Sequence, residues 1–297
     1  MRIVVSGSHG MVGTALLPAL AARGHEVIRL VRSPVAASPE IPWDPQAGRL
    51  DPASLSGVEA VIHLAGENIA SKRWSDEQKK RIRESRVKGT SLLAETMAGL
   101  AEAPRVFISS SAIGYYGDRG DETLSEDSPP GNGFLSRVCQ AWESATAPAV
   151  RKGIRVVLLR FGIILSPSGG ALKKMLLPFR LGLGGPLGTG RQQMSWITLD
   201  DAVGVVLHIL DFSALRGPVN AVTSRPVSNS EFTHTLGRVL HRPAMLPMPA
   251  FAARLAFGEM ADALLLSSTR VEPQRLLASR YPYQDPELEP ALRRLLS

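Results

Sequence analysis

The stretch Arg2-Ile3-Val4-Val5-Ser6-Gly7-Ser8-His9-Gly10-Met11-Val12-Gly13 decides the fold of this chain. Its first five residues form a short apolar run, and an apolar helical pattern begins at Met11. The glycines between them follow the spacing G-x-x-G-x-x-G. A strand, a glycine-rich turn and a helix in this order are typical of the turn that holds a dinucleotide pyrophosphate, because the free N–H groups of the helix N-terminus face the phosphates. A plain structural turn is the alternative.

Length and composition limit the class of protein. The 297 residues, 44% of them hydrophobic, suffice for one α/β domain with a smaller lobe. The sequence contains no run of 18 apolar residues, so we expect neither a membrane span nor a membrane partner. The first strand begins at once, which argues against a signal peptide. Cys139 is the single cysteine, so the chain cannot form an internal disulfide. A chain without disulfides favours a reducing, cytoplasmic location.

The net charge of +7 raises the question of an anionic partner. The densest charged cluster runs from Lys79 to Lys88, and we interpret it as the exposed face of a helix. A phosphate contact by one of its members is the second interpretation. Nucleic-acid binding comes last, because no aromatic residues are interleaved to stack on bases. No residues are assigned as metal ligands.

Strands and helices alternate through the first half of the chain. We predict strands at residues 2–6, 27–31, 60–64, 105–109, 155–160 and 219–222. We predict helices at residues 11–23, 75–100, 133–152, 200–211 and 228–240, and an irregular stretch at 33–56. Such alternation indicates a Rossmann-like, doubly wound parallel sheet of the α/β class with helices on both faces.

The composition of the sequence changes after residue 165. Glycine-rich loops follow, and such loops often bind or cover a substrate. We therefore divide the chain into a dinucleotide-binding core, 1–165, to which 200–225 returns, and a substrate-side lobe, 166–199 and 226–297. This lobe is loop-rich and helical, and its apolar tail residues are expected to be buried.

The end of the second strand predicts which dinucleotide binds. An acidic residue there would select NAD, whereas an arginine accommodates the 2′-phosphate of NADP. The sequence reads Val31-Arg32-Ser33 with no carboxylate. A guanidinium matches the geometry of a phosphate, so we predict NADP(H). The alternative is that Arg32 is an ordinary surface residue of a basic protein.

A series of further motifs runs along essentially the whole chain. They are Trp43-Asp44-Pro45, Leu64-Ala65-Gly66-Glu67-Asn68-Ile69, Arg73-Trp74, Ser85-Arg86-Val87-Lys88-Gly89-Thr90, Ser111-Ala112-Ile113-Gly114-Tyr115-Tyr116-Gly117, Trp142-Glu143, the 178–185 and 190–192 glycine loops, Ser195-Trp196-Ile197, Gly258-Glu259-Met260 and Arg270-Val271-Glu272-Pro273. On these motifs the chain resembles the extended short-chain dehydrogenase/reductase superfamily, and most closely its branch of uncharacterised, epimerase-like proteins. The resemblance implies NADP(H) but no established substrate; a sugar nucleotide is one candidate.

The resemblance also implies which residues contact the cofactor. They are Gly7, His9, Gly10, Met11, Val12, Gly13, Arg32, Leu64, Ala65, Gly66, Arg86, Ser109, Ser110 and, in the loop after the 155–160 strand, Ile163. An arginine at position 86 would reach the pyrophosphate bidentately, and a surface charge is the alternative. Five other residues are expected on the substrate side: Glu67, Asn68, Arg191, Ser195 and Trp196.

The catalytic pair of this superfamily is missing from the sequence. Its active members carry Tyr-x-x-x-Lys on one helix, where the lysine lowers the pKa of the tyrosine that exchanges a proton with substrate. None of the four tyrosines is followed by a lysine at that spacing. Aligning the helix on Trp142-Glu143 places Leu135 and Cys139 at the two positions, and neither can do this chemistry.

Three residues remain as catalytic candidates. Ser111 matches the residue that orients the substrate oxygen in the superfamily. Tyr115 and Tyr116 follow the same strand and are candidate replacement acids, although a tyrosine with a pKa near 10 needs a nearby cation to act as a base. Two functions therefore stay open: an NADP(H)-dependent oxidoreductase-like or epimerase-like enzyme, and an NADP(H)-binding structural or redox-sensing protein without turnover. The oligomeric state is not predicted.

Overall fold

A large, mostly parallel sheet organises the computed structural model, which describes residues 1–33 and 39–297. Within the described residues its strand order is β12-β8-β6-β5-β1-β2-β3-β4, and only β3 and β4 pair antiparallel. The strands are β1 (Arg2–Ser6), β2 (Glu26–Val31), β3 (Glu40–Asp44), β4 (Arg49–Leu50), β5 (Ala60–His63), β6 (Val106–Ala112), β8 (Arg155–Phe161) and β12 (Gly217–Ala221). The order reverses at β1, where doubly wound sheets bind their ligands.

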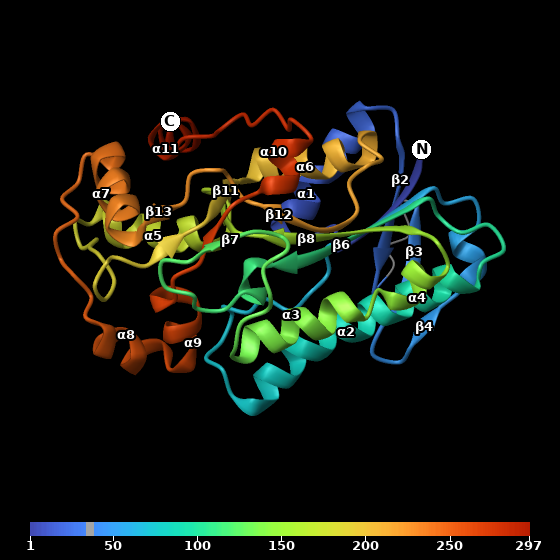
Figure 1. The fold of residues 1–297 in the computed structure, drawn as a ribbon, viewed down its shortest axis with the longest axis horizontal. Helices are drawn as coiled ribbons and strands as arrows, with labels where there is room; N and C mark the ends of the chain where they lie inside the picture. Colours follow the sequence, from blue (N-terminus) through green and yellow to red (C-terminus); the bar gives the residue numbers. More distant parts are fainter. Residues whose placement is uncertain (34–38) are drawn as a thin grey trace.

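Helices cover both faces of this sheet (Figure 1). Successive side chains of a strand point to opposite faces, so Ile3 and Val5 pack with Leu16 of the first helix, whereas Val4 packs with Leu93 of the second. One layer holds α1 (Met11–Ala22), α6 (Leu199–Asp211) and α10 (Gln274–Ala278). The other holds α2 (Asp76–Gly99), α3 (Phe134–Ser144) and α4 (Ala147–Arg151).

A smaller lobe lies beyond the carboxyl ends of the strands, at the left of Figure 1. Its core joins α5 (Gly170–Arg180), α7 (Asn229–Leu240) and α11 (Leu288–Leu296). The remaining helices are α8 (Ala250–Phe257) and α9 (Glu259–Ala261), the short 3₁₀ helices η1 (Pro52–Leu55) and η2 (Ile113–Tyr115), and the π-helical turn η3 (Asp262–Leu266). Three strand pairs complete the structure: β9 (Ile163–Leu165) with β11 (Trp196–Thr198), β10 (Gln193–Met194) with β13 (Val227–Ser228), and β7 (Thr123–Leu124) with β14 (Arg270–Val271).

The α/β class and the doubly wound parallel sheet are confirmed. Two predicted helix starts are also confirmed, because Ser75 Oγ accepts the Gln78 N–H at 3.2 Å and Ser228 Oγ accepts the Glu231 N–H at 3.1 Å. Strand β12 comes from the 200–225 stretch and pairs with β8. The division into core and lobe itself stays a prediction. None of the described helices is both long enough and apolar enough to cross a membrane.

Three local predictions were wrong. The helix expected at 133–152 is two helices, α3 and α4. Pro148 has no N–H to donate to the Ser144 carbonyl, so the helical hydrogen bonds are interrupted there. Beside this break the Thr146 hydroxyl donates to the Glu143 carbonyl at 2.7 Å. The stretch 33–56 holds β3, β4 and η1, although residues 34–38 lie outside the described part. Ile163 lies in strand β9, paired with Trp196, rather than in a loop.

Candidate functional site

The turn between β1 and α1 depends on glycine at two positions. Gly7 has φ +71°, and a Cβ built on it would lie 2.6 Å from the Leu64 carbonyl carbon. A Cβ on Gly13 would lie 2.3 Å from the Gly7 oxygen. The turn is closed by the Gly10 N–H, which donates to the Gly7 carbonyl at 3.0 Å. Bare backbone therefore packs against bare backbone at this turn, which only glycine allows.

The first turn of α1 is suited to an anion. Gly10 is its N-cap, and no side-chain cap bond or acidic residue is found there among the described residues. The N–H groups of the first turn therefore have no side-chain acceptor, and no acidic side chain of this turn offsets the positive end of the helix dipole. His9 and Gly10 are exposed beside it, while Met11 and Val12 are half-buried. Arg32 and Ser33 follow the neighbouring strand β2, and both are exposed.

The loop after β5 forms the next wall of the site. Leu64 donates its N–H to the Ser6 carbonyl at 3.2 Å, which holds the loop against the glycine turn. Leu64 and Ala65 are half-buried and Gly66 is exposed. Glu67 donates its N–H to Ser85 Oγ at 3.0 Å, and Asn68 Oδ1 accepts the Ala70 N–H at 2.9 Å. Helix α2 thereby fixes the start of this loop.

Arg86 lies behind the loop rather than on an open surface. Its Nη1 donates to the carbonyls of Glu67 and Ile82, each at 3.0 Å, and its guanidinium lies 5.0 Å from the Trp142 ring centroid. Burial lowers the pKa of this guanidinium from its ordinary value. A Cβ on Gly66 would lie 3.3 Å from Arg86 Cζ. Glycine at position 66 therefore lets the loop pass directly over the Arg86 guanidinium. The contact of Arg86 with a pyrophosphate stays a prediction.

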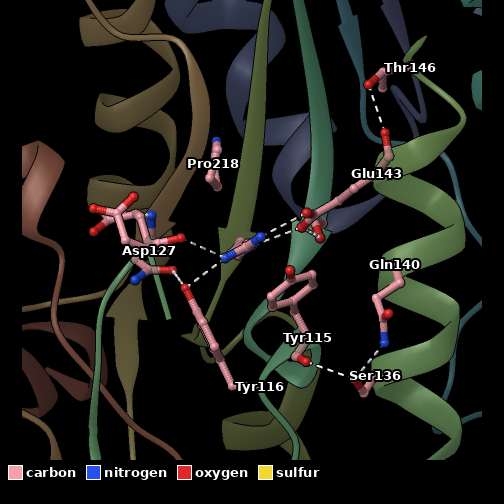
Figure 2. A network of polar contacts seen from close by, with 12 residues as sticks. Tyr115, Tyr116, Asp127, Ser136, Gln140, Glu143, Thr146 and Pro218 are labelled. Carbon is pink, nitrogen blue, oxygen red and sulfur yellow. Dashed lines mark hydrogen bonds and ion pairs between the residues drawn. The ribbon is translucent and has the colours of Figure 1, made fainter. Parts of the chain in front are cut away.

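A buried ion pair forms the centre of the site (Figure 2). Arg160 of β8 donates from Nε and Nη2 to the two carboxylate oxygens of Glu143 of α3, each at 2.8 Å. The side chains are only 4% and 10% exposed. Ser111 donates its hydroxyl to Glu143 Oε1 at 2.6 Å. A two-point pair of this kind fixes both groups in space, so Ser111 is held by the helix opposite.

The two tyrosines differ in their surroundings. Tyr116 is fully buried; its hydroxyl donates to Asn220 Oδ1 at 2.7 Å and accepts from Arg160 Nη1 at 2.9 Å. Burial raises the pKa of Tyr116 to about 12. Tyr115 is half-buried, and the Arg160 guanidinium lies 3.5 Å from its ring centroid. Among the described residues we find no partner for the Tyr115 hydroxyl.

Leu135 and Cys139 lie on α3, beside the segment that follows β6. A Cβ on Gly114 would lie 3.3 Å from Leu135 Cβ and 3.9 Å from Cys139 Sγ. Burial, together with the neighbouring Glu143 charge, raises the pKa of the Cys139 thiol to about 12. The thiol is therefore neutral near pH 7 and behaves as a small packed side chain.

The other predicted residues are placed as follows. Ser109 and Ser110 are buried in β6, and Ile163 is half-buried in β9. Ser195 is 1% exposed; its hydroxyl donates to the Thr269 carbonyl at 2.9 Å and accepts the Val271 N–H at 2.8 Å. Trp196 is fully buried and its Nε1 donates to the Arg225 carbonyl at 3.1 Å. Arg191 is exposed.

Sequence reasoning missed Glu143, Arg160 and Asn220 as members of the site. The other polar groups of Asn220 are also bonded: its N–H donates to Glu126 Oε1 at 3.1 Å and its Nδ2 donates to the Glu272 carbonyl at 3.0 Å. One signal was available for Arg160: a cation that ends an apolar strand needs a buried partner. Nothing in the spacing of the sequence indicated which carboxylate that partner is.

Contacts between the core and the lobe lie close to the same loop. Lys174 of α5 donates from Nζ to the Ala70 carbonyl at 2.7 Å. Lys79 of α2 forms an ion pair with Glu259 of α9. A Cβ on Gly258 would lie 2.9 Å from Arg73 Nε, so this loop and the segment before α9 are in close contact. The lobe is thus tied to the loop that follows the cofactor-side strand β5.

Comparison with protein families gives two matches. Residues 3–221 match the model of the NAD dependent epimerase/dehydratase family, and residues 248–295 match a domain of unknown function (DUF1731). An epimerase family protein of Mycobacterium bovis is 44% identical over 274 residues, which are 92% of this chain and 90% of that protein. Human epimerase family protein SDR39U1 is 38% identical over 300 residues, the whole of both chains.

Two solved structures extend these likenesses. The human epimerase family protein SDR39U1, crystallised with NADPH, has a TM-score of 0.92 at 36% identity over 99% of each chain. A nucleoside-diphosphate sugar epimerase from Corynebacterium glutamicum has a TM-score of 0.72 at 34% identity, over 99% of this chain and 64% of that one. The first of these shares the fold over essentially the whole of this chain.

Proposed function

Because this chain belongs to the NAD dependent epimerase/dehydratase family, we propose that it binds NADP(H) and works as an oxidoreductase-like or epimerase-like enzyme. The observation that carries the proposal is the glycine turn before α1: a Cβ on Gly7 or Gly13 would collide with backbone, and among the described residues the helix that follows has neither a side-chain cap bond nor an acidic residue in its first turn. The human relative crystallised with NADPH supports the same cofactor. Tyr-x-x-x-Lys is absent from the sequence, so the proton must come from elsewhere.

The residues around the turn are assigned to parts of the cofactor. The N–H groups at the start of α1 would hold the pyrophosphate. Arg32, exposed after β2, would hold the 2′-phosphate through its guanidinium, with Ser33 beside it. Leu64 and Ala65 would line the adenosine half. When bound, the nicotinamide supplies or accepts a hydride.

This cofactor assignment predicts a selective thermal shift. NADPH and NADP should raise the melting temperature clearly more than NADH and NAD, because only the first two carry the phosphate for Arg32. Stabilisation by a ligand grows with the ratio of its concentration to its Kd, so equal concentrations rank the four directly. Equal shifts from all four would contradict the role of Arg32.

We assign the proton to Tyr115. Its hydroxyl is not used by the described residues, whereas that of Tyr116 is bonded to Asn220 and Arg160. The Arg160 guanidinium lies against the face of the Tyr115 ring, 3.5 Å from its centroid, and this cation–π contact holds the ring in one orientation. Tyr115 would give its phenolic proton to the substrate oxygen as hydride reaches the adjoining carbon. Glu143 keeps Arg160 in place for this step.

Replacing Tyr115 by phenylalanine should therefore lower turnover by about 100-fold or more, the usual effect of losing a general acid. Oxidation of NADPH would be followed by absorbance with a panel of sugar nucleotides, aldehydes and quinones. Tyr281→Phe is the matched control: it removes a tyrosine hydroxyl that bonds to Asp201 of α6 and takes no part in the Arg160 contacts, so turnover should stay within a few-fold. Unchanged turnover in Tyr115→Phe, with NADPH binding intact, would exclude the assignment.

A second candidate is binding without turnover, in which NADP(H) is a structural ligand or a redox signal. Leu135 and Cys139 favour it, because they fill the positions of the catalytic pair with groups that exchange no proton near pH 7. The same panel separates the two candidates. No oxidation of NADPH with any panel member, in a protein that binds it selectively, would favour this second function.

The core–lobe contacts should control how fast the cofactor leaves. Glu259→Gln removes the ion pair with Lys79, and we expect NADPH to dissociate about 2–5-fold faster, since a partly exposed pair contributes up to about 1 kcal/mol. Asp262→Asn is the matched control, because it removes a similar exposed pair with Arg254 on the same segment. Stopped-flow displacement measures both rates. Equal rates in the two variants would show that the Lys79 contact has no such effect.

A further inference from the structure

A hollow of about 810 Å³ opens on the smaller lobe, between α7, α11 and the turn after α7. These helices lie at the opposite end of the molecule from β2 and β3 (Figure 1). The hollow is lined by His234, Gly237, Arg238, His241, Arg242, Pro243, Ala244 and Arg293. Five of these eight residues are arginine or histidine, and none is a carboxylate.

The backbone after α7 builds one wall of this hollow. His241 has φ +53° and ends the helix in the left-handed conformation. The next N–H, of Arg242, donates to the Gly237 carbonyl at 3.0 Å. A Cβ on Gly237 would lie 2.7 Å from Ala244 Cβ, so glycine is what allows the chain to fold back over the helix. This return places Arg242 on the same hollow as Arg238.

Each arginine is oriented by bonds that leave part of its guanidinium unused. Arg242 donates from Nε to the Arg180 carbonyl at 3.0 Å and from Nη1 to the His241 carbonyl at 3.1 Å. Arg238 and Arg293 both bond to Glu289, at 2.8 Å and 2.6 Å. Within residues 1–33 and 39–297 we find no partner for Arg242 Nη2, Arg238 Nη1 or Arg293 Nη1. Glu289 thus pairs with two of the three guanidinium groups, and the third, that of Arg242, bonds only to backbone carbonyls.

We propose that this hollow is an anion site that binds a phosphate group, separate from the dinucleotide turn. Oriented guanidinium groups with free N–H donors match phosphate oxygens in geometry and charge. Apolar side chains border the site: Leu181, Leu183, Met245 and Leu246 are 64%, 59%, 77% and 55% exposed. The phosphate therefore belongs either to a soluble polyphosphate or to a lipid headgroup whose chains would contact this border.

The test measures binding of inorganic tripolyphosphate to the full chain by calorimetry, with and without saturating NADPH. We expect the same Kd in both conditions, and a Kd about tenfold or more weaker in the double variant Arg242→Ala with Arg293→Ala, since bonds to charged groups are strong. Arg105→Ala with Arg151→Ala is the matched control, because it removes two exposed arginines and the same net charge elsewhere. Unchanged melting temperatures confirm that the variants fold.

A second arm identifies the source of the phosphate. Co-sedimentation with phosphatidylglycerol vesicles, but not phosphatidylcholine vesicles, that is lost in the Arg242/Arg293 variant would assign a lipid headgroup. Tripolyphosphate binding without vesicle binding would assign a soluble ligand. Three results would overturn the proposal: no binding of either probe, equal weakening in the control variant, or displacement of tripolyphosphate by NADPH.

Discussion

Glu143→Leu is expected to lower the free energy of unfolding by about 3–5 kcal/mol, because it leaves the buried Arg160 guanidinium without its counter-charge. Both side chains are almost fully excluded from solvent, so water cannot replace the lost carboxylate. The Ser111 hydroxyl loses its acceptor in the same variant. Urea denaturation followed by circular dichroism measures the change as a shift in midpoint at constant slope.

Two controls separate this effect from a general loss of charge. Glu143→Leu combined with Arg160→Met removes both charges, and most of the lost stability should return, as for other buried pairs replaced by apolar residues. Glu122→Leu breaks an exposed pair with Arg119, in which the Glu122 side chain is 49% exposed. This change should lower the free energy of unfolding by less than about 1 kcal/mol. A double variant as unstable as Glu143→Leu would contradict the account of the pair.

Gly7→Ala is expected to weaken cofactor binding strongly and to destabilise the fold. A left-handed conformation costs an alanine about 1–2 kcal/mol. The added Cβ would also meet the Leu64 backbone at 2.6 Å, which must move, at a further cost of about 1–3 kcal/mol. That movement displaces the N–H groups that face the phosphates, so NADPH affinity should fall by about 100-fold or more.

Gly24→Ala is the matched control for this variant. Gly24 has φ +74° but no atom within 4 Å of a built Cβ. It therefore carries the conformational cost alone and should leave NADPH binding unchanged. Chemical denaturation and fluorescence titration of the two variants give both quantities. If Gly7→Ala is no worse than Gly24→Ala in stability and in affinity, the close approach of the turn to β5 has no functional role.

Local patterns in the sequence were enough to predict most of the sheet. The apolar runs at β1, β5 and β8 and the caps at Ser75 and Ser228 depend on neighbouring residues only, so they can be recognised without the fold. Strand β3 was missed because its residues, with Pro42 and two acidic ends, have no apolar run. The break after α3 was missed although Pro148 marks it.

The centre of the site could not be predicted in the same way. Tyr116 and Asn220 are 104 positions apart, and Arg160 reaches Glu143 from a different element. Pairs of this kind are created by strand order and helix packing, which no local spacing encodes. The assignment of Leu135 and Cys139 to the positions of the catalytic pair stays a prediction; the structure places both on the single helix α3.

The most direct test of the central claim, that the glycine turn and Arg32 select NADP(H), is a calorimetric titration of the protein and of Arg32→Glu with NADPH and NADH. For the protein itself we predict a Kd for NADPH at least about tenfold below that for NADH, because a guanidinium–phosphate contact exists only with NADPH. For Arg32→Glu the order should reverse, since the carboxylate repels the phosphate. Equal affinities in the protein, or an unchanged preference in Arg32→Glu, would contradict the account.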